Sequence, residues 1–238
     1  EREGDNFPLE NISRLITGLK ELGTRYIILT GGEPMMHPGI TDIVRRIGEE
    51  DIEIILGTNG FRVADRIEEL LPVSTFSISL DGPPAHHDYY RGEGSHAVAL
   101  AAVRAAREKG KGVQLQFTMT RDLIKSFEYV KSTAEELGCF IGINILRPQR
   151  QAEGGVNAPA ESGEEEIDAF FDYLLRTRPK VLPYPSSLIR RLKSWPYSYG
   201  RDVITAKADL KGYKPPSCSA GRFMIAIDHR GNIYPCAK

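Results

Sequence analysis

Five short apolar stretches alternate with helix-like segments along the first 148 residues, at intervals of about 25 to 30 residues. Strands that alternate with helices in this way form right-handed βαβ units, which build a parallel sheet. The pattern fits a TIM-like barrel or an open doubly wound sheet, and in both a ligand binds at the carboxyl ends of the strands. We expect strands over residues 26–30, 52–57, 74–80, 113–119 and 140–146, a helix after Pro8, and helices over 40–49, 63–71, 95–108 and 126–137.

The stretch Tyr26–Pro38, with the sequence YIILTGGEPMMHP, contains the first of these strand ends. Its first four residues are apolar, which predicts a buried strand. Gly31 and Gly32 then let the backbone come close to a ligand, because no Cβ stands in the way. Glu33 places a carboxylate at this edge, and Pro34 stiffens the turn. Such a site suits a small cationic group, for instance an amino group; the simpler alternative is a tight turn with a solvated glutamate.

Unusual polar and glycine residues also follow the other strands. They are Thr58–Gly60, Ser79–Gly82, Thr118–Thr120 and Asn144. The alternation of Ser77–Gly82 predicts that Ser79 and Asp81 point to the same side, a geometry that suits hydroxyls such as a ribose diol. An ordinary Asp-Gly turn is the alternative. Downstream, the planar guanidinium of Arg91 suits a carboxylate, whereas His86 and His87 are expected to be surface groups or caps in a loop.

The composition excludes several classes of protein. A net charge of −1 offers no electrostatic basis for binding nucleic acid or a membrane surface. No apolar run approaches the roughly 20 residues needed to cross a bilayer. The three cysteines, an odd number in a long chain, argue against a secreted disulfide framework. We therefore expect a protein of the reducing cytosol with no nucleic-acid or membrane partner.

The remainder of the chain has a different organisation. A polar segment of 15 residues after Pro148 predicts a linker, followed by a helix over 164–177 that Ser162 opens. We expect two short helices between residues 183 and 216, and a β-hairpin formed by Arg222–Asp228 and Asn232–Cys236. The predicted divisions are a barrel over 1–148, a linker and helical segment over 149–216, and a small extension from 217 to 238.

Cys218 and Cys236 flank the predicted hairpin, which would bring their two thiolates near each other. Thiolates are soft ligands that favour zinc or iron–sulfur clusters. A disulfide and two inert buried thiols are the alternatives. Cys139, at the start of a predicted buried strand, is expected to be a core residue.

Four motifs in this order and spacing resemble those of the radical S-adenosylmethionine (SAM) enzymes that carry a SPASM or twitch extension. They are ILTGGEPMMHP, LGTNG, SISLDGPPAHHDYYRG and CSAGRFMIAIDHRGNIYPC. The resemblance covers nearly the whole chain and is weakest across residues 149–216. It implies a partial (β/α)6 TIM-like barrel with a small C-terminal extension that contains a β-hairpin.

The resemblance also implies a role for each candidate residue. The methionyl amino group of SAM would be held in the turn that contains Gly31, Gly32, Glu33 and Pro34, with Asn59 nearby. Ser79 and Asp81 would contact the ribose or the methionyl carboxylate, and Arg91 that carboxylate. The remaining implied residues are Thr118 and Asn144, which would line the pocket, and Cys218 and Cys236, which match the first two ligands of an auxiliary iron–sulfur cluster.

In this family a reduced [4Fe–4S] cluster splits SAM into methionine and a 5′-deoxyadenosyl radical, which abstracts hydrogen from a substrate. The cofactor supplies the difficult chemistry, and the protein positions it. The resemblance implies a peptide, protein or small-molecule substrate and a reductant such as flavodoxin or ferredoxin. Peptide or protein modification is our preferred hypothesis, with cofactor biosynthesis and activation of a partner enzyme as alternatives.

One motif of the family is missing, namely the CxxxCxxC that binds the radical-generating cluster. The three cysteines present all lie far downstream of the position where it would stand, before the helix that begins near Pro8. We therefore expect the sequence to be an excerpt of a longer protein. Two other hypotheses remain: a cluster-free barrel that binds a nucleotide-like ligand or acts as a scaffold, and a zinc protein that uses Cys218 and Cys236.

Overall fold

The computed structural model describes residues 9–145, 162–193, 224–228 and 231–234. Its centre is a five-stranded, wholly parallel sheet in the order β1-β2-β3-β4-β5. The strands are β1 (Tyr26–Leu29), β2 (Glu53–Thr58), β3 (Thr75–Ser79), β4 (Gly112–Met119) and β5 (Phe140–Ile145). The predicted parallel α/β architecture is therefore confirmed, and each expected strand is present with its ends shifted by one residue or less.

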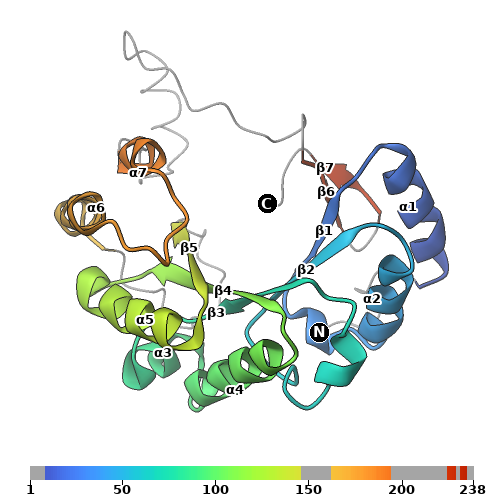
Figure 1. Cartoon of the computed structure of the whole chain (residues 1–238), viewed down its shortest axis with the longest axis horizontal. Helices are drawn as coiled ribbons and strands as arrows, with labels where there is room; N and C mark the ends of the chain where they lie inside the picture. Colours follow the sequence, from blue (N-terminus) through green and yellow to red (C-terminus); the bar gives the residue numbers. More distant parts are fainter. Residues whose placement is uncertain (1–8, 146–161, 194–223, 229–230, 235–238) are drawn as a thin grey trace, which may run out of the picture.

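The sheet curves into an open arc, and the helices lie along its outside (Figure 1). They are α1 (Leu9–Glu21), α2 (Ile40–Gly48), α3 (Pro84–Arg91), α4 (Ser95–Glu108), α5 (Leu123–Leu137), α6 (Glu164–Thr177) and α7 (Ser186–Lys193). Within the described residues β1 and β5 are the two edge strands and do not pair with each other. The arc is thus a partial barrel rather than a closed one.

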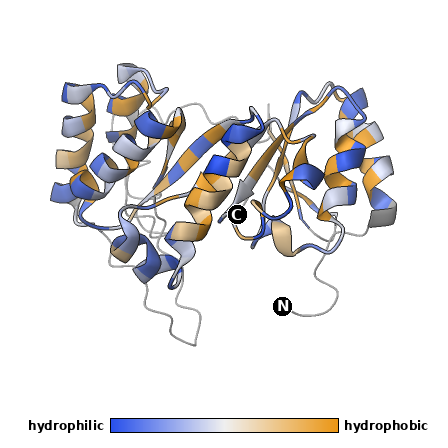
Figure 2. Ribbon diagram, turned by 60° about the horizontal axis from the view of Figure 1, so that its bottom comes forward, coloured by the Kyte–Doolittle hydropathy of each residue, from blue (hydrophilic) through white to orange (hydrophobic). Residues whose placement is uncertain are grey.

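The two faces of the sheet differ because alternate side chains of a strand point to opposite sides. In β4, Val113, Leu115, Phe117 and Met119 are buried against the helices. Figure 2 shows hydrophobic residues gathered where the helices meet the sheet. The alternate residues form what we call the concave face, which consists of Ser77 and Ser79 of β3, Gln114, Gln116 and Thr118 of β4, and Phe140, Gly142 and Asn144 of β5. The concave face is largely polar, and the core lies on the helical side.

The prediction that β1 is buried was wrong. The exposed fractions of Tyr26 and Ile28 are 50% and 47%, whereas Ile27 and Leu29 pack against the core. As an edge strand, β1 has only β2 as a neighbour among the described residues, and its Tyr26 and Ile28 point to the inner side of the arc. An apolar run therefore marked a strand correctly but overstated its burial.

Two local predictions were also wrong. Instead of a helix over 63–71 the chain forms turns and a short 3₁₀ helix, η2 (Ile67–Leu70). The helical stretch is short because Arg62 before it has a positive φ of 58°, and Pro72 after it has no N–H to donate to a further turn. Conversely, Pro84 begins the helix α3, where a loop was expected; proline is well suited to the first turn because its missing N–H has no helical partner there.

The start of α6 also differs from the expectation. Ser162 does not cap the helix, since its hydroxyl donates to the Thr120 carbonyl at 2.5 Å, and the capping position is Gly163. Ser162 instead connects the approach to α6 with the end of β4. The helix itself has the predicted bounds.

Three phenylalanines link α6 to the sheet. The ring centroids of Phe117 on β4, Phe127 on α5 and Phe170 on α6 lie between 5.3 and 6.0 Å apart, and all three side chains are fully buried. Contacts of this kind favour edge-to-face and tilted arrangements. The helix therefore shares one hydrophobic core with the five-stranded sheet and its other helices.

At the C-terminal end, β6 (Ala226–Ile227) and β7 (Ile233–Tyr234) form an antiparallel pair, as expected for the hairpin. One of the two helices predicted within 183–216 is α7; residues 194–216, together with Cys218 and Cys236, lie outside the described residues. In the part of the chain that the structure describes, every helix is too short or too polar to cross a membrane.

The aromatic cluster predicts a large stability loss when α6 is uncoupled from the sheet. Phe170→Ala should lower the free energy of unfolding by about 3–5 kcal/mol, because it removes a buried ring and leaves a cavity. Phe61→Ala is the control, since that ring is 43% exposed, and its cost should stay below about 1 kcal/mol. Chemical denaturation measures both values. Similar losses in the two variants would show that α6 does not share the core.

Candidate functional site

The turn after β1 places two exposed glycines at the carboxyl edge of the sheet. Gly31 has a φ of 155°, a conformation that L side chains rarely adopt, although an added Cβ would meet no atom within 4 Å. Glycine is thus required here by the backbone conformation, and the space beside it is open. Pro34 follows as the first residue of a short 3₁₀ helix, η1 (Pro34–Met36), and is buried.

Glu33 ties the ends of β1 and β2 together. Its Oε1 accepts hydrogen bonds from the Thr58 hydroxyl at 2.7 Å and the Met35 N–H at 3.1 Å, and its Oε2 accepts from the Asn59 N–H at 2.7 Å. A carboxylate offers about two acceptor positions on each oxygen. Oε1 is therefore fully engaged, and one position on Oε2 is left for a further donor.

Asn59 lies beside Glu33, as the sequence predicted, but through its backbone. The side-chain Oδ1 of Asn59 accepts from the Phe61 N–H at 2.8 Å, and the Thr58 hydroxyl oxygen accepts from the Gly60 N–H at 3.0 Å. These local bonds fix the turn after β2. They hold the Asn59 N–H towards Glu33. The ends of β1 and β2 are therefore joined by hydrogen bonds to the Glu33 carboxylate.

A second group of predicted residues gathers at the ends of β3 and β4. The Oδ1 of Asp81 accepts from the Thr118 N–H at 2.9 Å, and its Oδ2 pairs with Nε of Arg91. Nη2 of Arg91 also donates to the Thr118 hydroxyl at 3.3 Å. The Arg91 side chain keeps an exposed fraction of 28%, whereas Asp81 is 1% exposed.

This arrangement changes the interpretation of Asp81. Its carboxylate is buried and engaged by Arg91 and Thr118, so it is not open to a ligand hydroxyl. Asp81 therefore positions the Arg91 guanidinium, and it extends the β3–β4 ladder with a side-chain acceptor. Sequence alternation did not reveal these partners, because Arg91 reaches Asp81 from the later helix α3.

The other predicted residues lie on the concave face near the same edge. Ser79 is in register with Gln116, and Thr118 with Asn144, whose side chain is exposed. Because all five strands are parallel, their carboxyl ends meet at one edge of the sheet. Two groups result, one around Glu33 and Asn59 and one around Arg91 and Thr118. Within the described residues no hydrogen bond joins the two groups.

His87 is a residue whose setting the sequence did not reveal. We expected a surface group, but it is fully buried, and its Nδ1 accepts from the Asp81 N–H at 3.1 Å. Burial lowers the pKa of His87 to about 4, so the ring is neutral at physiological pH. With Nδ1 as acceptor, the proton lies on Nε2. His87 thus helps to hold Asp81, and the position of its ring follows from the unpredicted helix α3.

Asp88 is a second residue that sequence reasoning missed. Its carboxylate accepts from the backbone N–H groups of Gly94 and His96 at 2.9 and 2.8 Å, and from the Ser95 hydroxyl at 3.1 Å. These bonds, led by the one from His96, lower the pKa of Asp88. The carboxylate of α3 therefore caps the beginning of α4 and fixes the helix that carries Arg91.

The described residues do not fit an iron–sulfur cluster. They contain no group of three or more histidine, cysteine, aspartate or glutamate residues that could hold a metal ion. Cys139 is 3% exposed, as predicted for a core residue, and burial raises the pKa of its thiol to about 11. A thiol held in its protonated form is a poor ligand. Cys218 and Cys236 lie outside the described residues.

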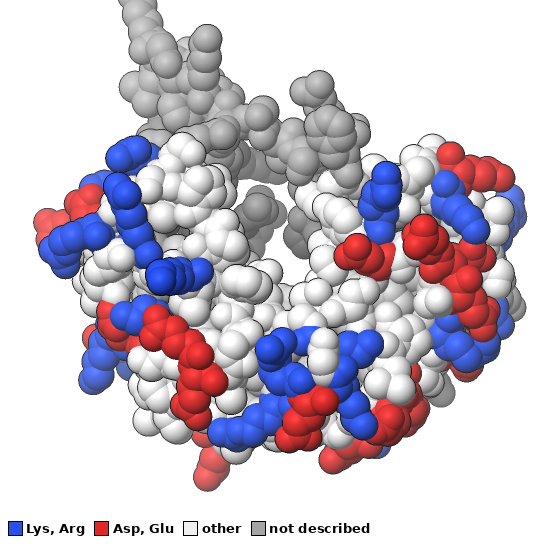
Figure 3. Space-filling view, in the orientation of Figure 1, with Lys and Arg blue, Asp and Glu red and all other residues white. Residues whose placement is uncertain are grey.

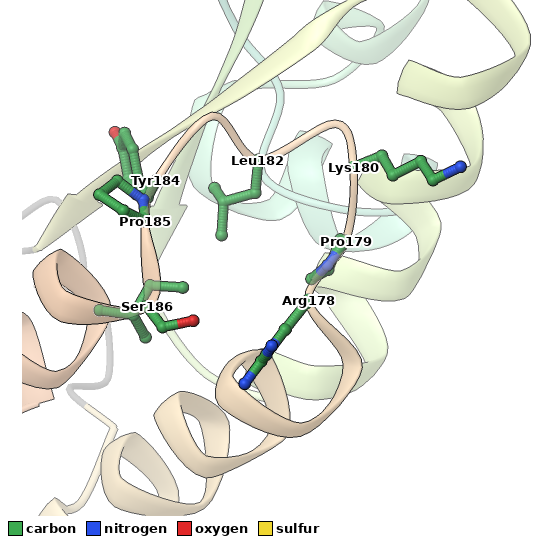
Figure 4. A pocket seen from close by; sticks show the side chains of 8 residues that line it. Arg178, Pro179, Lys180, Leu182, Tyr184, Pro185 and Ser186 are labelled. Carbon is green, nitrogen blue, oxygen red and sulfur yellow. The ribbon is translucent and has the colours of Figure 1, made fainter.

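One pocket lies elsewhere, in the connection from α6 to α7 (Figure 4). It has a volume of about 280 Å³, and Arg178, Leu182, Tyr184 and Ile189 are among its lining residues. None of the candidate residues lines it. Its lining residues lie within residues 178–189, and one of them, Tyr184, accepts a hydrogen bond from the Ile143 N–H of β5 at 3.3 Å.

Comparison with known families agrees with this arrangement. The model of the radical SAM superfamily matches residues 1–137, more than half of the chain. The chain belongs to the radical SAM superfamily. The family uses SAM and a [4Fe–4S] cluster, and its fold agrees with the partial barrel described above.

Among curated proteins, the chain is 26% identical to an AdoMet-dependent heme synthase of Nitratidesulfovibrio vulgaris, over 97% of the chain and 65% of that protein. It is 25% identical to the mycofactocin maturase MftC of Mycobacterium tuberculosis, over 93% of the chain and 54% of that protein. The chain therefore spans only about half to two thirds of the length of these relatives.

Among solved structures, Streptococcus suis SuiB bound to S-adenosylmethionine superposes with a TM-score of 0.67 at 15% identity. The match covers 96% of the chain and 53% of SuiB. At this identity the likeness concerns the fold, which it supports for nearly the whole chain.

The burial of His87 predicts a pH-dependent stability. The unfolded chain binds the His87 proton below about pH 6.5, whereas the folded protein binds it only below about pH 4. The stabilising contribution of neutral His87 is therefore complete above pH 6.5 and decreases as the pH falls to 4, by about 3 kcal/mol in total.

Denaturation of the wild type and of His87→Asn between pH 7.5 and 4 measures this contribution. Asparagine keeps an acceptor for the Asp81 N–H but does not titrate. We expect a shallower pH dependence in the variant. Equal slopes in the two proteins would contradict the assignment.

Proposed function

We propose that this chain is the SAM-binding barrel of an enzyme that generates a 5′-deoxyadenosyl radical and abstracts hydrogen from its substrate. The observation that carries the proposal is the meeting of the GGEP turn, Asn59, Arg91 and Thr118 at one edge of a parallel sheet in a member of this superfamily. Ligands of parallel α/β sheets bind at this edge.

In this proposal the methionyl amino group binds at the turn after β1. A protonated amine has three donors, and the remaining acceptor position on Oε2 of Glu33 supplies one charge-assisted bond. Exposed backbone at Gly31 and Gly32 is the natural source of further acceptors. The three bonds that Glu33 already accepts would keep its carboxylate oriented before the ligand arrives.

The methionyl carboxylate is assigned to Arg91. Its Nε and Nη2 are engaged by Asp81 and Thr118, whereas Nη1 makes no hydrogen bond with another described residue. Because the guanidinium is planar, fixing two of its nitrogens also directs the third. Ser79 remains our candidate for the ribose hydroxyls and Asn144 for the lining of the pocket, with Asp81 as a positioning residue.

When bound, SAM and a reduced [4Fe–4S] cluster supply the radical chemistry, and this chain supplies the orientation of SAM. Residues 1–238 contain no CxxxCxxC, so the proposed activity needs three further thiolates. We assign Cys218 and Cys236 to an auxiliary cluster in an extension that begins near residue 217. A reductant such as flavodoxin or ferredoxin, and a cytosolic location, complete the proposal.

A peptide or protein is our preferred substrate. MftC is named a maturase, and another structural match is SuiB bound to its precursor peptide SuiA, at 15% identity. The heme synthase relatives support a small-molecule precursor of a cofactor as the alternative. The absence of CxxxCxxC also keeps a cluster-free barrel that binds a nucleotide-like ligand as a second candidate function.

Binding of SAM to the chain tests the assigned site. Glu33→Ala should weaken binding at least tenfold and lower the free energy of unfolding by about 1–3 kcal/mol, because it leaves the donors of Thr58 and Asn59 unpaired. Isothermal titration with SAM and chemical denaturation measure the two effects. Glu49→Ala, whose exposed side chain pairs with Arg45, should leave SAM affinity unchanged. Unchanged affinity in Glu33→Ala would contradict the amino-group assignment.

Anaerobic reconstitution with iron and sulfide tests the activity in the protein encoded by the complete reading frame. We expect about eight or more irons per chain, and 5′-deoxyadenosine after SAM and a strong reductant are added. Changing both Cys218 and Cys236 to alanine should remove about one cluster. Iron without 5′-deoxyadenosine would contradict the radical activity, and neither iron nor product would favour the cluster-free barrel.

A further inference from the structure

Two glutamine side chains lie next to each other on the concave face of β4. Gln114 is in register with Ser77 on one side and Phe140 on the other, and Gln116 is in register with Ser79 and Gly142. Both are partly buried, whereas Leu115 between them is fully buried against the helices. The two amides therefore belong to the inner surface of the arc and not to the core.

Their mutual hydrogen bond leaves a donor and an acceptor free. Nε2 of Gln114 donates to Oε1 of Gln116 at 2.9 Å, and the Ser77 hydroxyl donates to the same oxygen at 3.4 Å. The amide NH₂ of Gln116 and the carbonyl oxygen of Gln114 have no partner within the residues that the structure describes. The pair thus presents both kinds of hydrogen-bonding group, already oriented by the bond between them.

Gly142 provides the space that the two amides occupy. A Cβ added at Gly142 would lie 1.9 Å from Nε2 of Gln114 and 2.6 Å from Oε1 of Gln116. Any other residue at this position of β5 would therefore displace the pair. The glycine is needed here for close approach and not for an unusual backbone conformation, since its φ is not positive.

The surroundings of the pair are uncharged. All concave-face positions of β3, β4 and β5 that define this surface are neutral, and Phe140, next to Gln114, is 58% exposed. Figure 3 shows that most charged side chains lie around the outer rim of the arc, with largely uncharged atoms around its centre. A charged ligand group would find no counter-ion among these positions, since Arg91, which bonds to Thr118 at the edge of the sheet, is already paired with Asp81. A neutral polar group next to an apolar one would be well matched.

The pair also lies at a suitable depth. A strand rises about 3.3 Å per residue, so Gln116 and Gln114 lie about 7 and 13 Å below Thr118 at the edge of the sheet. The assigned SAM site is at that edge. A substrate whose amide group binds to the glutamines would lie on the concave face, below the SAM molecule at the edge of the sheet.

We propose that Gln114 and Gln116 form a binding site for an uncharged amide group of the substrate, with Phe140 contacting an adjacent apolar side chain. The Gln114 side-chain oxygen accepts a hydrogen bond from the N–H of the substrate amide. The Gln116 NH₂ donates a hydrogen bond to the carbonyl oxygen of the same amide. This chemistry fits the backbone of a peptide. The assignment of this amide to a substrate rests on the proposed function. Binding of an amide to the two glutamines can be measured without SAM.

The probes are N-acetyl-L-phenylalanine amide, which is neutral, and N-acetyl-L-phenylalanine, which carries a carboxylate at neutral pH. Titration of the isotope-labelled chain by NMR follows the side-chain NH₂ signals of Gln114 and Gln116. We expect the neutral amide to shift these signals and to bind at least fivefold more tightly than the carboxylate.

Two variants test the residues. Gln116→Glu keeps an acceptor for Gln114 and Ser77 but removes the NH₂ donor and adds a charge, so it should weaken binding of the neutral amide at least fivefold. Gly142→Ala should do the same by displacing both amides. Gly57→Ala is the matched control on the inner side of β2, because its new Cβ would meet no atom closer than 3.4 Å.

The outcomes separate this inference from the proposed function. If SAM binds but the neutral amide does not, or binds equally to the wild type and both variants, the inference is overturned. A preference for the carboxylate probe also overturns it and favours an acidic substrate. If the amide binds as expected and SAM does not, the amide site stands and the proposed function fails.

Discussion

The structure depends on the parallel alignment of five strands whose side chains alternate between two faces. One alternate set, including Phe76, Leu115 and Phe117, is buried under the helices. Because this set forms the core, the other set is released from packing and can carry polar groups on the concave face. The same parallel alignment brings all carboxyl ends to one edge, where each strand contributes a different chemical group.

At that edge the charged groups are held before any ligand binds. Glu33 bonds to the end of β2, and Arg91 is held by Asp81 and Thr118. Buried His87 and the capping carboxylate of Asp88 in turn fix the segment that presents Arg91. Preorganisation of this kind lowers the free-energy cost of ligand binding, since the side chains are already ordered.

The sequence predicted the βα order, the strand positions and the neighbourhood of Glu33 and Asn59, because these follow from periodicity and from the glycines after β1. It did not predict α3, since the apolar periodicity of residues 84–91 is weak and a proline begins the helix. Without that helix, the burial of His87 and the bond between Asp81 and Arg91 could not be foreseen. They arise from contacts between α3, β3 and β4 that no local pattern encodes.

The exposure of β1 illustrates a second limit of prediction from sequence. Tyr26 and Ile28 belong to the same run as Ile27 and Leu29, but they lie on the inner side of an edge strand and are exposed. Gln114 and Gln116 show the opposite case, in which polar residues inside a central strand identify the inner face. Their pairing above Gly142 required the register of β4 and β5.

The most direct test of the account is a crystal structure of the chain with SAM. We predict that the methionyl amino group lies within hydrogen-bond distance of Glu33 or of the Gly31–Gly32 backbone, with the carboxylate at Arg91. Density for SAM in the pocket between α6 and α7, or at any place away from the carboxyl edge of the sheet, would contradict the central claim.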